Sequence, residues 1–136
     1  MPTLLVAHEP ASAARTRKAL LADLGARGIE PESIEEVLLV MSELVGNAIR
    51  HTAPTATRDL SVSWQVSADS IVVQVSDPSA QRPVQRYVTV DEPSGRGLTI
   101  VDALTTKWGT DEHASGKRVW AEVPLRRADV PMHAVR

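Results

Sequence analysis

The sequence predicts one α+β domain, in which two helices are followed by paired strands. Apolar residues recur at helical spacing over residues 11–26 and again from 31 to about 51. Apolar and polar residues then alternate over 60–66, 71–77 and 118–125, which is typical of half-buried strands. The length of 136 residues fits a single domain with one core.

The first predicted elements are a short strand over residues 3–7 and a helix over 11–26. A glycine at 25 or 28 is expected to end this helix, because glycine adopts the conformations that close many helices. A second helix is expected to begin at Pro31, since proline at the first helical position removes an N–H that has no partner there.

Ser33 and Glu36 form a capping-box pattern just inside this second helix. The apolar residues of the helix cluster on one stripe, which consists of Ile34, Val37, Leu38, Met41, Leu44, Val45, Ala48 and Ile49.

Two polar residues near the end of this helix are candidates for a site. Glu43 and Asn47 are predicted to lie roughly opposite the apolar stripe, and their spacing of four places one above the other. A carboxylate next to a carboxamide, with Arg50 beside them, is suited to hold a hydrated Mg²⁺ and a phosphate. The alternative is an ordinary solvated helix face, which is common on surface helices.

An acidic residue ends the second alternating strand. Counting by two from Ile71 reaches Asp77, so this carboxylate is predicted to point to the same face as the apolar residues. A carboxylate aimed into a core needs a hydrogen-bond partner, because burying it unpaired is unfavourable. The alternative is a turn residue beyond the strand, since the run from Asp77 to Ser79 has good turn chemistry.

Two glycines precede a third predicted helix. Residues 80–94 show weak periodicity, and a structureless segment of this length is often a lid. Gly95 and Gly97 follow, just before an apolar helix that starts near Leu98. Free N–H groups at such a helix start suit a phosphate. A glycine turn without a ligand is the alternative.

The remaining segments complete the organisation of the chain. Residues 108–110 are expected to form a strand, 111–116 a turn and 118–125 a closing strand. Residues 1–125 are therefore assigned to the domain, and the polar residues 126–136 to a loose tail.

Composition narrows the classes of function. A net charge of -2 gives no broad electrostatic footprint for nucleic acid. The chain has no cysteine, which excludes disulfides, thiol catalysis and thiolate metal sites. Neither a signal peptide nor a run of about 18 apolar residues is present in it. We therefore expect a cytoplasmic protein without membrane or direct nucleic-acid contacts.

The order of these features resembles a known superfamily. Glu43 and Asn47 on a helix, Asp77 at a strand end and the run Gly95-Arg96-Gly97 before a helix resemble the GHKL (Bergerat-type) ATP-binding superfamily. The resemblance covers nearly the whole chain, to about Leu125. It implies a two-layer α/β sandwich with a mixed, mainly antiparallel sheet and three helices on one face.

Within that superfamily the chain is most similar to the bacterial anti-sigma-factor serine/threonine kinases. Three stretches carry this similarity and look like the actinobacterial branch: Val-Ser-Asp-Pro-Ser from Val75, Gly-Arg-Gly-Leu-Thr-Ile-Val from Gly95, and Gly-Lys-Arg-Val-Trp-Ala-Glu from Gly116.

The resemblance implies a role for each matching residue. Asn47 matches the ligand of a Mg²⁺ that bridges the ATP phosphates, and Glu43 matches the general base. Asp77 matches the acid that accepts the adenine amino hydrogen. Arg50 stands where histidine kinases often have a lysine that contacts phosphate.

The glycine-rich run has the matching role at the phosphates. The backbone at Gly95 and Gly97 would approach them under the lid, with Arg96 and Leu98 in the same cofactor-binding segment.

Two stretches depart from the family pattern. Pro78 and Ser79 follow Asp77 where relatives more often have Asp-x-Gly, and a lost glycine would stiffen the lid hinge. Lys117 and Arg118 stand near the place where many relatives have a threonine that supports adenine through water.

The resemblance implies an ATP-dependent serine/threonine kinase that phosphorylates a STAS-type anti-anti-sigma protein and, when free, binds a sigma factor. One alternative is a non-catalytic nucleotide-binding adaptor or anti-sigma factor. Another is a histidine-kinase-like catalytic domain that works in trans. Relatives are often homodimers, and the sequence leaves the oligomeric state open.

Overall fold

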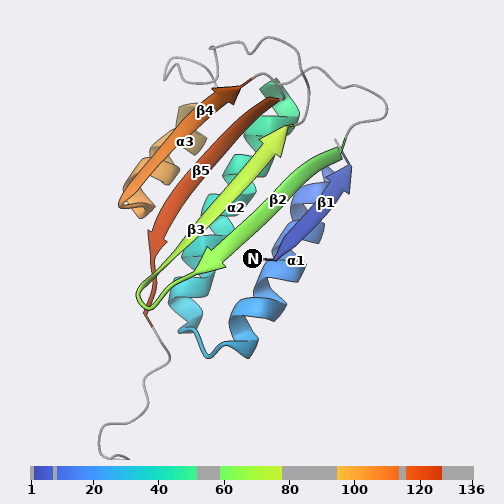
Figure 1. The fold of residues 1–136 in the computed structure, drawn as a ribbon. Coiled ribbons are helices and arrows are strands. Elements are labelled where there is room, and N and C mark those ends of the chain that lie inside the picture. Colours follow the sequence, from blue (N-terminus) through green and yellow to red (C-terminus); the bar gives the residue numbers. More distant parts are fainter. Residues whose placement is uncertain (1, 8, 52–58, 78–94, 114–115, 127–136) are drawn as a thin grey trace, which may run out of the picture.

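The computed structural model describes residues 2–7, 9–51, 59–77, 95–113 and 116–126, except for the side chains at 51, 95–98, 112 and 113. The described residues form an α+β domain of two layers, in which three helices cover one face of a five-stranded sheet (Figure 1). The predicted fold class is therefore confirmed.

The elements follow one another in the order β1 Thr3–Ala7, α1 Ala11–Ala26, α2 Pro31–His51, β2 Asp59–Val66, β3 Ser70–Asp77, α3 Gly95–Leu104, β4 Lys107–His113 and β5 Gly116–Pro124. In the sheet the strands lie in the order β1-β2-β3-β5-β4. Each of the four pairings between these described strands is antiparallel, so the sheet is more uniform than the mixed arrangement expected from the resemblance.

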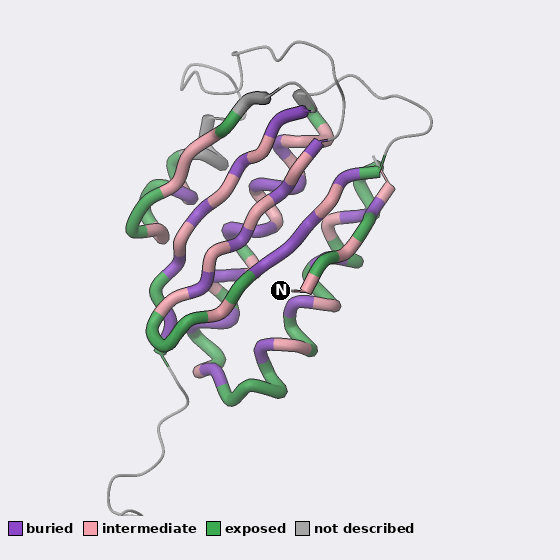
Figure 2. Tube along the Cα trace, viewed as in Figure 1, coloured by how far each residue is buried: buried purple, intermediate pink, exposed green. Residues whose placement is uncertain are grey.

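The core lies between the helices and the inward face of the sheet. Buried and partly exposed residues alternate along β3 and along most of β5, as Figure 2 shows. Alternate residues of a strand point to opposite faces, so one face of each strand packs on the helices. The fully buried side chains at its centre include Leu20, Leu24, Val37, Val40, Met41, Leu44, Val45, Leu60, Val62, Ile71 and Val73.

A partly buried hydrogen bond links helix α1 to the sheet. The indole N–H of Trp64 on β2 donates to Asp23 Oδ2 over 2.7 Å, and Arg27 Nε donates to the same oxygen over 3.1 Å. Gly28, with a φ of 75°, follows the end of the helix, whereas Gly25 lies inside it. The expected glycine stop is therefore at Gly28, where a side chain would be strained.

Helix α2 begins at Pro31, as predicted. The predicted capping box is wrong, because Ser33 lies inside the helix and its hydroxyl accepts the backbone N–H of Arg126 over 2.9 Å. The carbonyl of Glu30 accepts the first helical N–H, from Ile34, over 3.0 Å.

Arg126 connects the end of β5 to the start of α2. Its guanidinium donates to Glu30 over 2.7 Å and to Glu32 over 3.3 Å. The hydrogen bond and charge of Glu30 raise the pKa of Arg126 above its ordinary value. Residues 127–136 of the predicted tail lie outside the described residues, so the boundary after residue 125 stays a prediction.

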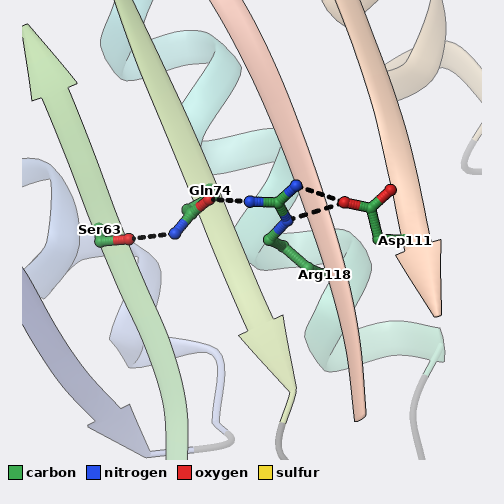
Figure 3. A network of polar contacts seen from close by, with 4 residues as sticks. All are labelled: Ser63, Gln74, Asp111 and Arg118. Atoms are coloured by element: carbon green, nitrogen blue, oxygen red, sulfur yellow. Dashed lines mark hydrogen bonds and ion pairs between the residues drawn. The ribbon is translucent and has the colours of Figure 1, made fainter. Parts of the chain in front are cut away.

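A row of polar side chains crosses the sheet on the face turned away from the helices (Figure 3). Gln74 Nε2 on β3 donates to Ser63 Oγ on β2 over 2.8 Å. Arg118 on β5 donates to Gln74 Oε1 over 2.8 Å and, through Nε, to Asp111 on β4 over 3.1 Å. Arg118 therefore belongs to the outer face of the sheet.

None of the helices within the described residues combines the length and the apolar character that crossing a bilayer requires.

Candidate functional site

The elements that carry the predicted site residues come together at one end of the domain. Figure 1 shows the C-terminal ends of α2 and β3 next to the start of β5, with the start of α3 at the same end. Helix α2 packs against β3, α3 and β5, so it is the element that joins the others.

Asn47 is buried, with 3% of its surface exposed. The prediction that it lies opposite the apolar stripe of α2 is therefore wrong. The stripe includes Val40, which is fully buried and which the predicted stripe omitted. Asn47 follows Val40 by seven residues, about two turns, and so lies on the same face. Glu43, one turn before Asn47, is half-buried at the border of this face.

Arg50 lies over Gly46 and contacts Asn47. Its Nη2 donates a hydrogen bond of 3.0 Å to Asn47 Oδ1. A Cβ built on Gly46 would lie 3.1 Å from Arg50 Nη1 and 3.8 Å from Arg50 Cζ. The guanidinium therefore lies close to the helix backbone, where position 46 has no side chain. It covers the carboxamide oxygen that the sequence predicts as a metal ligand.

Asp77 is the last residue of β3 and is 7% exposed. Its inward orientation is as predicted, and the alternative of a turn residue beyond the strand is excluded. Lys117 on β5 stands directly opposite it in the strand register and is 8% exposed. Directly opposed residues have Cβ atoms about 5 Å apart. A carboxylate and an ammonium therefore share the inward face at this end of the sheet.

Sequence reasoning gave no role to Gly46 and placed Lys117 only as a departure from a family pattern. For each of these two residues the sequence contains a feature that could have indicated its position. Counting back by two from Ala121 through Val119 reaches Lys117, which is the same argument that turns Asp77 inward. A glycine inside a helix is unfavourable by about 1 kcal/mol relative to alanine, so Gly46 needed a packing reason.

Helix α3 starts at Gly95, so Gly95 and Gly97 form its first turn instead of preceding it. The N–H groups of a first helical turn have no acceptor within the helix and point outward. The side chains of Arg96 and Leu98 fall outside the described residues, and so does the predicted lid at 80–94. Their predicted contacts with a nucleotide stay predictions.

The donors at the end of α2 fit Mg²⁺ in kind. The carboxamide oxygen of Asn47 and the carboxylate of Glu43 are hard oxygen ligands, one helical turn apart. In the described part of the chain no cluster of three or more His, Asp or Glu side chains could hold a metal alone. Mg²⁺ usually keeps several waters and takes other ligands from the phosphates of a substrate. Asn47 therefore suits a metal that arrives with a nucleotide.

Two shallow hollows lie elsewhere, on the outer side of α2. Their volumes are about 430 and 450 Å³, and they share Glu35 and Leu39 in their walls. No predicted site residue lines either hollow. Their position separates them from the polar end of α2, β3 and α3.

Comparison with known proteins agrees with this fold. The family described as histidine kinase-like ATPase domain matches residues 6–123. A comparison with curated protein sequences finds no significant match.

Solved structures with the same fold include domains of a mycobacterial protein and of histidine kinases. The RsbU and RsbW domains of Rv1364c from Mycobacterium tuberculosis align with a TM-score of 0.65 and 19% identity, over 94% of this chain and 34% of that one. The histidine kinase domain of a blue-light-activated kinase from Erythrobacter litoralis EL346 aligns with a TM-score of 0.56 and 18% identity, over 85% of this chain and 60% of that one. This chain thus spans less than two thirds of the length of either protein.

The catalytic domain of the histidine kinase ThkA is closer in size. It aligns with a TM-score of 0.53 and 15% identity, over 93% of this chain and 99% of that one. At these identities the structures show a shared fold, while the family match spans almost the whole described domain. The chain therefore belongs to the histidine kinase-like ATPase domain family of the GHKL superfamily.

Proposed function

We propose that the chain binds Mg²⁺-ATP at the shared end of α2, β3 and α3 and transfers the γ-phosphoryl group to a serine or threonine of a partner protein. Phosphoryl transfer depends mainly on positioning and on neutralising charge, for which few side chains are needed. The residues gathered at this end supply a metal ligand, a base and backbone donors.

Each residue has a stated role in this proposal. Asn47 holds Mg²⁺ on the phosphates, and Glu43 accepts the proton of the substrate hydroxyl. Asp77 accepts a hydrogen bond from the adenine amino group, and the first turn of α3 donates N–H groups to phosphate. Arg50 adds positive charge beside the same phosphates.

The observation that supports this function best is the burial of two polar side chains at one end of the domain. Asn47 is 3% and Asp77 7% exposed, although Asn47 lies in the last turns of α2 and Asp77 ends β3. Buried polar groups are retained where they have partners or a function. A base-reading carboxylate at one position and a metal-binding amide at the other give both a function.

The biological role follows from the similarity to anti-sigma kinases. We propose that the substrate is a STAS-type anti-anti-sigma protein, that the unengaged kinase binds a sigma factor, and that the protein acts in the cytoplasm. The RsbW domain of Rv1364c supports this assignment only through its fold.

Two measurements test the proposal. Calorimetric binding of Mg²⁺-ATP to the wild type and to Asn47→Ala tests the metal role, and we expect the variant to lose most of the affinity. Phosphate transfer to a candidate STAS protein then tests the kinase. Glu43→Gln is the matched control, since it is expected to bind ATP and to transfer no phosphate.

A second candidate function is a non-catalytic nucleotide-binding adaptor that sequesters a sigma factor. The positions of Lys117 and Arg50 favour it, because each places a cation against a predicted ligand group. Tight Mg²⁺-ATP binding without transfer to any STAS protein would support the adaptor over the kinase.

A further inference from the structure

We propose that Arg50 and Mg²⁺ compete for the carboxamide oxygen of Asn47. The guanidinium donates a hydrogen bond to this oxygen, and it moves to the phosphates when Mg²⁺ and nucleotide bind together. The inference rests on the proposed function, because it gives a mechanism for loading the same site.

The first support is the hydrogen bond itself. Arg50 Nη2 lies 3.0 Å from Asn47 Oδ1, which is an ordinary length for such a bond. The carboxamide is nearly inaccessible to solvent, so its oxygen can be approached from few directions. The guanidinium takes one of these, at the border of the buried face.

The second support is the charge of the two candidates. An amide oxygen has two lone pairs, but a guanidinium and a divalent cation bound to the same oxygen would lie within a few ångströms of each other. Like charges at such a distance repel strongly in a partly buried site. Mg²⁺ is therefore expected to bind Asn47 only after the guanidinium has moved.

The third support is Gly46, which leaves room for the guanidinium beside the helix. A side chain at this position would place its Cβ 3.1 Å from Arg50 Nη1, closer than most real contacts of a Cβ. The glycine thus lets the guanidinium lie against the helix and turn back toward Asn47. The helix dipole also favours a cation near the C-terminal end of α2, but that effect does not require this glycine.

A triphosphate supplies the new partner for Arg50. Guanidinium groups bind phosphate oxygens with paired, charge-assisted hydrogen bonds. A nucleotide can therefore draw the guanidinium away from Asn47 and expose the oxygen to the metal. Free Mg²⁺ provides no such acceptor, so Mg²⁺ alone is expected to bind this site poorly.

The test is the Mg²⁺ dependence of the binding of a fluorescent ATP analogue to the full chain. We expect Arg50→Gln to lower the half-saturating Mg²⁺ concentration about tenfold and to weaken binding in EDTA about tenfold, in line with the loss of one charge-assisted hydrogen bond. Gly46→Ala is expected to lower the Mg²⁺ requirement in the same direction. Arg15→Gln, which removes an exposed charge on α1, is the matched control and should change neither quantity.

A purely structural role of Arg50 would shift the thermal stability. It would not lower the Mg²⁺ requirement and at the same time weaken the binding of the analogue in EDTA. An unchanged Mg²⁺ requirement in both Arg50→Gln and Gly46→Ala would overturn the competition. Arg50→Lys, which keeps the charge, should restore part of the binding in EDTA.

A second measurement separates this inference from the proposed function. Mn²⁺, added without nucleotide, is titrated while the side-chain amide signal of Asn47 is followed by NMR. Broadening of this signal at lower Mn²⁺ in Arg50→Gln than in the wild type supports the competition, even if no variant binds a nucleotide and the proposed function fails. Equal broadening in both proteins overturns it.

Discussion

Asp77 on β3 and Lys117 on β5 oppose each other directly in the strand register, and both side chains are buried. These two charged residues lie at one end of the sheet, on the face that packs on the helices, where the other residues are mainly apolar. Each charge therefore reduces the unfavourable burial of the other.

The first prediction concerns this pair. Lys117→Met removes one partner and leaves the carboxylate of Asp77 buried opposite an apolar side chain. We expect a loss of about 3 kcal/mol in the free energy of unfolding, at the lower end of the range for breaking a buried pair. Urea denaturation measures it. In a double-mutant cycle with Asp77→Asn, the second change should cost much less than it does alone, and simple additivity would show that the two residues do not interact.

The second prediction concerns the base that the site selects. Asp77→Asn replaces an acceptor-only carboxylate by an amide that can also donate. We expect the preference for ATP over GTP to fall at least tenfold, because a site built around one hydrogen-bond pattern loses its discrimination when that pattern changes. Competition of the two nucleotides for a fluorescent analogue measures the ratio. An unchanged ratio would place the base elsewhere.

The third prediction concerns the attachment of α1. Asp23→Ala leaves the indole N–H of Trp64 without its acceptor, and we expect a loss of about 1–3 kcal/mol in stability. The chain supplies a matched control, since Trp108 donates to Asp102 in an exposed bond of 3.4 Å. Asp102→Ala should therefore change the stability by less than about 0.5 kcal/mol. Thermal unfolding of both variants decides the comparison, and equal losses would contradict the account.

The fourth prediction separates two neighbouring residues by the face they occupy. Arg118 contacts Gln74 and Asp111 on the outer face of the sheet (Figure 3), whereas Lys117 is buried on the inner face. Arg118→Gln should lower the stability by about 1 kcal/mol. Nucleotide affinity should stay within about twofold, because the distance across the sheet separates this charge from the site. A large loss of affinity would show that the outer face takes part in binding.

Much of the fold was predictable because its pattern is local. Apolar residues stand at every second position of β2 and β3. Pro31 marks the start of α2 because proline is favoured at the first helical position. Strand β4 was predicted as three residues but extends from Lys107 to His113. Its polar residues show no alternation, and pairing with β5 determines their conformation.

The rest depended on packing that a single segment does not reveal. Asn47 was placed on the wrong face because the rotation of α2 about its axis depends on its packing against other elements, which also buries Val40. Ser33 was interpreted as a cap, yet its partner is Arg126 at the far end of the chain. The start of α3 at Gly95 was missed because glycine weakens any local helix pattern.

The most direct test of the account is an amide NMR titration of the full chain with Mg²⁺ and a non-hydrolysable ATP analogue. We predict that the largest shift changes fall on Asn47, Asp77 and the first turn of α3. Changes confined to the outer hollows beside Leu39, or no saturable change at all, would contradict a nucleotide site at the shared end of α2 and β3.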